Sequence, residues 1–240
     1  MAAETSYTEL LSFGDQGWGD ELLLGGWLTI QISVCAYLVG MALGLLGAGA
    51  KLSGNRWAGW IGDLYTTIVR AVPELLLIIF IFYTGTSTLG QLFGAIGLGG
   101  DIQVSPFAAA VAALGFIAGA YMTEVFRGAI LAVPKGQMEA ARAYGMPSAL
   151  RFRRIMFPQM MRYALPGLGN LWLVVIKDSS LISVVGFYEL LFSAKQAAAS
   201  ERMYFFFYSV GALAFLALTI ASMVGIFVAE RRVSRGVRPV

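Results

Sequence analysis

The chain has 240 residues, of which 58% are hydrophobic and 13% charged, with a mean hydropathy of +0.73 and a formal net charge of +3. In soluble domains about a quarter of all residues are charged, so this composition excludes an ordinary water-soluble enzyme. The chain has no histidine and a single cysteine, Cys35. Histidine-based zinc or haem sites, cysteine clusters and intrachain disulfides are therefore excluded, and we expect neither a metal site nor a catalytic residue.

Five apolar stretches follow a polar, acidic N-terminal segment, residues 1–21, which lacks the basic start and apolar core of a cleaved signal peptide. Each is long enough to cross about 30 Å of hydrocarbon as a helix, which takes ~20 residues. They lie near residues 22–48, 57–84, 106–126, 162–183 and 204–229. The sequence thus predicts one all-α integral membrane domain, residues 22–229, with five transmembrane helices.

The basic residues orient these helices. Thirteen of the 17 Lys and Arg lie between spans one and two, between spans three and four, or after span five. By the positive-inside rule these segments are cytoplasmic, so we expect a periplasmic N-terminus and a cytoplasmic basic tail, residues 230–240. The positive charge then reflects orientation and contact with anionic lipid, and we expect no nucleic-acid partner.

Small residues mark one face of the first span. Gly40, Gly44 and Gly47 leave this face without side chains. Another helix can approach such a face closely, so the spacing predicts a packing contact.

Two pairs of charged residues interrupt apolar spans. Arg70 and Glu74 are four residues apart in span two, on one face of a helix that Pro73 should kink, and Lys177 and Asp178 lie in span four. A charge at the bilayer centre costs on the order of 3 kcal/mol, so these side chains should face the bundle interior or a wet cavity. Counting ~1.5 Å per residue places both pairs at similar depth, about 20 Å from the cytoplasmic edge.

These pairs have two interpretations. The charges could neutralise one another within the protein. Alternatively, Arg70 and Lys177 could contact the carboxylate of a zwitterionic amino acid, while Glu74 and Asp178 contact its ammonium group or a basic side chain.

The segment 127–158 is too polar to cross the membrane and too long for a simple connection. Good helix formers at 138–144 end at Gly145, which suits a C-terminal cap. Ser148 should cap a second helix that runs through Ile155 and ends at Pro158. We expect Glu124 and Arg127 to anchor the start of this loop, and residues 187–199 to form a short helix before span five.

The same loop carries a resemblance. Glu139-Ala140-Ala141, three residues, Gly145, nine residues, Ile155, one residue and Phe157-Pro158 resemble the EAA motif of ABC-importer permeases, EAA-x3-G-x9-I-x-L-P, with Phe157 in the place of leucine. Residues 65–83, 116–136, 152–170 and the end Glu230-Arg231-Arg232 resemble polar amino-acid permeases. More narrowly, they are similar to the Q-type subunits of histidine/lysine/arginine/ornithine importers and of opine importers.

This resemblance implies a subunit of the bacterial inner membrane that imports polar amino acids, basic ones or opines. Its partners would be a second permease subunit (a similar M-type paralogue or an identical copy), two ATP-binding cassette subunits and a periplasmic amino-acid-binding protein. The EAA loop would be the coupling helix that docks on an ATPase subunit. ATP and Mg would be bound by that subunit, because this chain lacks G-x-x-x-x-G-K-[ST]; residues 47–51 have neither the spacing nor the hydroxyl.

Two other classes of membrane protein share some of these features. An ion-coupled secondary amino-acid transporter would also hold intramembrane charges, but the chain shows no inverted repeat and carries the long EAA-like loop. A membrane anchor of an electron-transfer complex is disfavoured by the absence of histidine.

Overall fold

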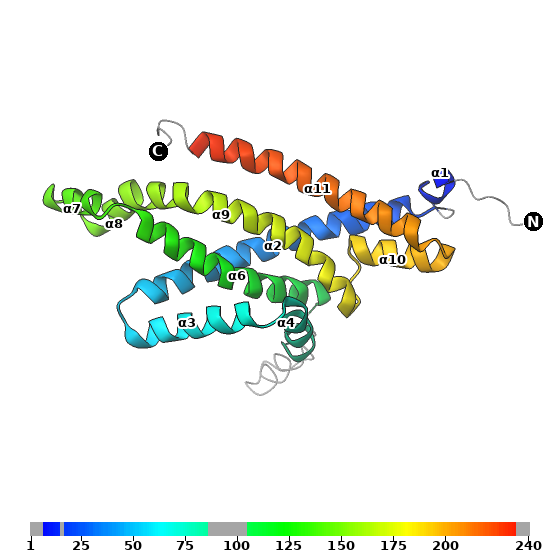
Figure 1. Cartoon of the computed structure of the whole chain (residues 1–240), viewed down its shortest axis with the longest axis horizontal. Coiled ribbons are helices and arrows are strands. Elements are labelled where there is room, and N and C mark those ends of the chain that lie inside the picture. The colour runs from blue at the N-terminus through cyan, green and yellow to red at the C-terminus, as the bar shows by residue number, and fades with distance from the viewer. Residues whose placement is uncertain (1–6, 15–16, 86–104, 234–240) are drawn as a thin grey trace, which may run out of the picture. The chain divides into compact units, whose positions relative to one another are not determined.

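A computed structural model describes residues 7–14, 17–85 and 105–233, and within these ranges the chain is helical without a strand (Figure 1). Residues 1–6 and 15–16 of the predicted N-terminal segment, and 234–240 of the predicted tail with Arg235 and Arg238, lie outside the described residues. The helices are α1 Tyr7–Leu10, α2 Gly19–Leu52, α3 Arg56–Ala71, α4 Glu74–Phe80, α6 Pro106–Ala132, α7 Lys135–Ala143, α8 Ser148–Arg151, α9 Phe157–Asp178, α10 Leu190–Glu201 and α11 Tyr204–Val233, with π-helical segments Ile81–Gly85 and Phe152–Met156 and a 3-10 segment Ser179–Val185.

Four of the described helical stretches are long and apolar enough to span a membrane without interruption. They are Gly19–Leu52, Pro106–Ala132, Ser148–Val185 and Tyr204–Arg232. The predicted second span is instead a pair of helices, Arg56–Ala71 and Glu74–Gly85, bent by 110°. The all-helical membrane class is confirmed, whereas the count of five holds only if the bent pair crosses as one span. The orientation of the termini stays a prediction.

Pro73 accounts for the break. Val72, the residue before it, is extended (φ −93°, ψ 138°), as a residue before proline prefers, and its N–H closes α3 by donating to the Ile68 carbonyl. The Pro73 carbonyl then accepts the N–H groups of Leu76 and Leu77, which begins α4. The expected kink is therefore a full interruption. The prediction that Arg70 and Glu74 share one helical face is wrong, because the two residues belong to different helices, one on each side of this interruption.

The prediction that Pro158 ends a loop helix is also wrong. The stretch from Ser148 to Val185 is one continuous span candidate that contains Pro158. A proline ring would collide with the carbonyl four residues earlier in an α-helix. Here the turn before it is π-helical, with the Phe157 N–H donating to the Phe152 carbonyl, and this wider turn accommodates the proline. Ser148 makes no capping bond; its Oγ accepts from Arg151 Nη2 at 2.8 Å.

The chain divides into two compact units. Unit 1 consists of residues 1–36, 78–114 and 175–220, and unit 2 of residues 37–77, 115–174 and 221–240. Each unit has its own packing, described in turn below.

In unit 2, α6 packs between the end of α2 and α3. A Cβ added to Gly44 would lie 2.6 Å from Met122 Cβ, so the absence of a side chain permits this approach. On the other side, the Tyr65 hydroxyl of α3 donates to the Phe116 carbonyl of α6 at 2.6 Å. The packing role predicted for the glycine face is confirmed.

In unit 1, a buried carboxylate joins α10 to α2. Glu189 is fully buried, and its oxygens accept the N–H groups of Leu191 and Phe192 at 2.9 Å, which caps α10. The Thr29 hydroxyl of α2 lies 3.4 Å from Glu189 Oε2 and accepts the Leu190 N–H at 3.1 Å. Burial raises the pKa of Glu189 to about 7, against the opposing effect of the two N–H groups. The short helix expected before the last span is confirmed.

Gly44→Ala should lower the melting temperature of the purified protein, because overpacking a tight contact costs about 1–3 kcal/mol. Gly49→Ala on the same helix is the control, since a Cβ there has no neighbour within 4 Å. Alanine is a better helix former than glycine, so the control should melt at the same or a slightly higher temperature. Equal melting temperatures for both variants and the parent would show that the α2–α6 contact is loose.

The raised pKa of Glu189 makes the folded state bind a proton more tightly than the unfolded state does. Its stabilising effect is therefore complete below pH 4.5 and is lost as pH rises through about 7, a change on the order of 3 kcal/mol. Melting curves at pH 5 and pH 8 should show this fall, and Glu189→Gln should remove most of it. An unchanged pH dependence in Glu189→Gln would contradict the assignment to this carboxyl.

Candidate functional site

The loop helix α7 ends in a Schellman cap. The Met146 N–H donates to the Ala141 carbonyl and the Gly145 N–H to the Arg142 carbonyl, each at 3.0 Å. Gly145 has φ +72°, a left-handed conformation that favours glycine. The predicted glycine cap is confirmed, and it turns the chain sharply between α7 and α8.

The outer surface of α7 is open. Glu139 and Ala140 are exposed, and Tyr144 is 91% exposed, whereas Ala141 is buried. A side-chain bond from Gln159 Nε2 to Gln137 Oε1, 2.6 Å long, ties α7 to α9. Of the remaining motif residues, Ile155 is half-buried and Pro158 exposed. The motif thus presents a small-residue and aromatic surface on a helix that is itself fixed to the bundle.

The first charge pair lies at two helix ends. Arg70 is in the last turn of α3 and Glu74 opens α4. A cation is stabilised at a helix C-terminus and an anion at an N-terminus, so the break itself favours both charges. Among the described residues, Arg70 and Glu74 form no ion pair with each other; the Arg70 guanidinium instead lies over the Tyr121 ring, 5.7 Å from its centroid. The mutual-neutralisation interpretation therefore does not hold for this pair.

The second pair also lies where an α-helix ends. Lys177 is exposed in the last turn of α9 and Asp178 is its half-buried last residue, before the 3-10 segment. The Lys177 carbonyl accepts the Ser180 hydroxyl at 2.6 Å. Lys177 and Asp178 belong to unit 1, whereas Arg70 and Glu74 belong to unit 2. That the two pairs lie at one depth stays a prediction.

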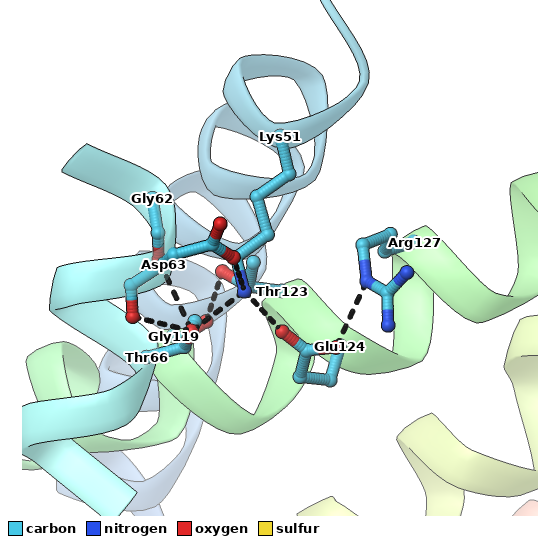
Figure 2. A network of polar contacts seen from close by, with 8 residues as sticks. All are labelled: Lys51, Gly62, Asp63, Thr66, Gly119, Thr123, Glu124 and Arg127. Carbon is cyan, nitrogen blue, oxygen red and sulfur yellow. Dashed lines mark hydrogen bonds and ion pairs between the residues drawn. The ribbon is translucent and has the colours of Figure 1, made fainter. Parts of the chain in front are cut away.

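A polar network in unit 2 was not predicted as a unit (Figure 2). Lys51 Nζ, at the end of α2, lies 2.9 Å from Asp63 Oδ1, contacts Glu124 Oε1, and donates to Thr66 Oγ1 at 2.7 Å. Glu124 Oε2 in turn accepts from Arg127 Nε at 2.9 Å. The Lys51 side chain is only 8% exposed. The network therefore fastens α2, α3 and α6 together just before α6 leads into the loop.

Beside this network lies a polar hollow of about 500 Å³. Its lining is Lys51, Thr66, Thr67, Arg70, Ala71, Tyr121 and Glu124. One of the sequence-predicted pathway residues, Arg70, thus shares a site with the Lys51 network. Among the described residues there is no group of three His, Cys, Asp or Glu that could hold a metal ion.

Sequence reasoning missed Lys51 and Glu189 for different reasons. The sequence pattern identifies Lys51 only as an orienting charge of a cytoplasmic loop, but α2 continues to Leu52 and the Lys51 side chain is only 8% exposed. Its partner Glu124 is 73 residues away, so no local pattern joins them. Glu189 caps α10, but glutamate is not among the preferred N-cap residues Ser, Thr, Asp and Asn, so the sequence gives no clear signal for this role.

Comparison with known proteins places this arrangement in a family. Residues 40–235 match the family described as binding-protein-dependent transport system inner membrane component. The chain is 46% identical to the nopaline transport system permease protein NocQ of Agrobacterium fabrum over 230 residues, covering 95% of this chain and 98% of the relative. It is 42% identical to the histidine/lysine/arginine/ornithine transport system permease protein HisQ of Escherichia coli over 222 residues, covering 92% and 97%.

Solved structures of ABC transporters contain chains with a similar fold. A chain of an amino acid ABC transporter crystallised with histidines has a TM-score of 0.74 and 28% identity, covering 90% of this chain and 95% of its own. A chain of the MetNI methionine ABC transporter shares the fold, with a TM-score of 0.71 at 18% identity, covering 89% and 97%. The resemblance predicted from the EAA motif is confirmed. The chain belongs to the family of binding-protein-dependent transport system inner membrane components, the membrane-embedded permeases of ABC importers.

Proposed function

We propose that this chain imports polar amino acids, basic ones or opines, as one permease subunit of a larger complex. The observation that carries the proposal is the exposed, Schellman-capped α7 with its EAA motif, in a chain that lacks a nucleotide-binding motif. In this proposal a second permease subunit, similar or identical, completes the pathway. Two ATP-binding cassette subunits bind ATP and Mg beneath it, and a periplasmic amino-acid-binding protein delivers the solute.

The surface of α7 suits docking to an ATPase subunit. Ala140 and Ala143 permit close approach, Glu139 offers a carboxylate for a basic partner, and Tyr144 offers an aromatic anchor. The loop is also mechanically connected. The helix before it, α6, ends at Ala132, three residues before α7 begins, and the stretch after it runs without interruption into α9. Movement of α7 would therefore reach two membrane helices directly.

The four intramembrane charges form the candidate solute pathway. Arg70 and Lys177 would meet carboxylates, and Glu74 and Asp178 would meet ammonium or guanidinium groups. Placement at helix ends supports this role, because interrupted helices in transporters direct their terminal dipoles and freed backbone groups to the solute. The substrate preferences of the relatives favour a solute with a basic side chain or an opine. Family membership offers no support for an ion-coupled secondary transporter.

Gly145→Pro or Glu139→Lys should abolish solute uptake while the chain still reaches the membrane. Proline has a fixed φ near −65° and does not fit the left-handed turn, and lysine reverses the charge offered to the ATPase. Uptake into vesicles and co-purification of the ATPase subunit measure the two effects. Gly136→Ala is the matched control, because Gly136 lies in the same loop with no neighbour within 4 Å of an added Cβ. Undiminished ATP-driven uptake by both loop variants would refute the docking role.

Glu74→Gln and Asp178→Asn remove one negative charge each without changing side-chain size. If these carboxylates meet the basic part of the solute, uptake of a basic amino acid should fall by about tenfold or more in each variant. Size-exclusion chromatography of the purified complex checks assembly. Normal uptake by both variants in a fully assembled complex would remove Glu74 and Asp178 from the pathway.

A further inference from the structure

Helix α3 is attached to unit 2 by a face with few apolar side chains. Its buried residues are Gly62, Thr66 and Val69, which lie on one side of the helix because they are four and three residues apart. Large apolar side chains of α3 are instead exposed, namely Trp57, Trp60, Ile61, Leu64 and Ile68. Between helices in lipid there is no hydrophobic driving force, so association depends on close packing and on polar contacts. The position of α3 therefore depends strongly on its polar contacts.

Lys51 of α2 is the centre of these contacts. Its Nζ lies 2.9 Å from Asp63 Oδ1 and donates to Thr66 Oγ1 at 2.7 Å. A Cβ added to Gly62 would lie 2.9 Å from Lys51 Cγ, so the alkyl stem of the lysine passes over this glycine. The ammonium group has three donors, and its third partner is Glu124 of α6. One side chain, only 8% exposed, thus joins three helices (Figure 2).

Glu124 lies on the part of α6 that leads into the loop. It is eight residues before the end of α6, which is about 12 Å along a helix. A second polar contact between α3 and α6, from the Tyr65 hydroxyl to the Phe116 carbonyl, is eight residues farther from the loop. On α3, Thr66 lies four residues before Arg70, about one helical turn. The Lys51 junction therefore connects the loop end of α6 with the charged end of α3.

We infer that Lys51 is a positioning residue for transport, which passes movement of the coupling loop from α6 to the end of α3. The inference rests on the proposed function, in which α7 docks to an ATPase subunit and Arg70 belongs to the solute pathway. The ammonium group acts through Glu124 and Thr66, not on the solute itself. Without it, α6 would still move with the loop, but α3 would no longer follow. ATP hydrolysis would then continue with little transport.

Lys51→Met is the variant that tests this role. Methionine has an unbranched side chain that can cover Gly62 as the lysine stem does, but it has no ammonium group. The change strands no carboxylate, because Glu124 keeps its bond from Arg127 and the Asp63 side chain is 70% exposed. Replacing a buried ion pair by an apolar group is often neutral for stability. The melting temperature and the assembly of the complex should therefore match those of the parent.

The measurement is the amount of solute moved per ATP hydrolysed by the complete complex, with its binding protein, in proteoliposomes. Radiolabelled L-arginine, L-histidine and nopaline are the probes. Lys51→Met should lower this ratio about fivefold or more, the lower end of typical coupling factors. Glu124→Gln should lower it too, and the double variant should be little worse than either single variant, because both changes break one contact.

Arg56→Gln is the matched control, because Arg56 is an exposed cation at the other end of α3. It should leave the ratio unchanged. An assembled Lys51→Met complex that moves as much solute per ATP as the parent would overturn the inference and leave the import function intact. A lower melting temperature at an unchanged ratio would also overturn it, since Lys51 would then be structural only.

If Lys51→Met does not assemble, Glu124→Gln decides by the same ratio: a fall supports the inference and a parental value overturns it. If the parent complex moves none of the three probes, the proposed import of basic amino acids or opines fails, and the inference fails with it.

Discussion

The apolar membrane places one constraint on this chain: every charge and every unpaired backbone group within a span needs a partner. The structure meets it by interrupting helices where the charges lie. Pro73 separates Arg70, at the end of α3, from Glu74, at the start of α4, so that each charge is stabilised by the adjacent helix terminus. Lys177 and Asp178 likewise stand where α9 gives way to a 3-10 segment. In the proposed function, the same interruptions supply the polar groups of the solute pathway.

Unit 2 connects the loop to the membrane helices by three kinds of contact. Glycines on α2 allow α6 to pack closely, the Lys51 network fastens α2 and α3 to α6, and the Gln137–Gln159 bond holds α7 against α9. Lys51 joins α2 to α3 and α6, and the hollow that contains Arg70 opens beside it. A displacement of α7 would thus be passed to α6 and α9, and α6 lines this hollow through Tyr121 and Glu124. In the proposed function, this connection is how a chain without a nucleotide-binding motif takes part in ATP-driven transport.

Periodicity and local chemistry predicted most of the architecture. Apolar runs predict the helices, Gly145 predicts the cap of α7, and Gly40 and Gly44 predict the packing face. Each of these features depends on residues close together in the chain. The 110° bend at Pro73 exceeds what a single proline dictates, since proline permits both a kink and a complete break. At Pro158 the sequence predicts a helix end, but the helix continues. The π-helical turn before Pro158 accommodates the proline, and α9 begins inside the predicted loop.

Long-range pairing lay beyond sequence reasoning. Lys51 and Glu124 are separated by 73 residues, and Thr29 and Glu189 by 160, so only the packed helices bring them together. For the same reason the motif identified the candidate coupling helix, while the hollow around Arg70 emerged from the structure alone. Arg70, Glu74, Lys177 and Asp178 are candidates for the pathway because a charge within a membrane is costly, and this criterion does not state what they bind.

The proposed function depends on α7 docking to a separate ATPase subunit. The most direct measurement replaces Tyr144, whose side chain is 91% exposed, with a photo-crosslinking phenylalanine derivative in the intact complex. Tyr204, 54% exposed at the start of α11, serves as the control position. Irradiation should join position 144 to the ATP-binding subunit, and the control position should give no such adduct. A transport-competent complex in which position 144 yields no adduct with that subunit would contradict the account.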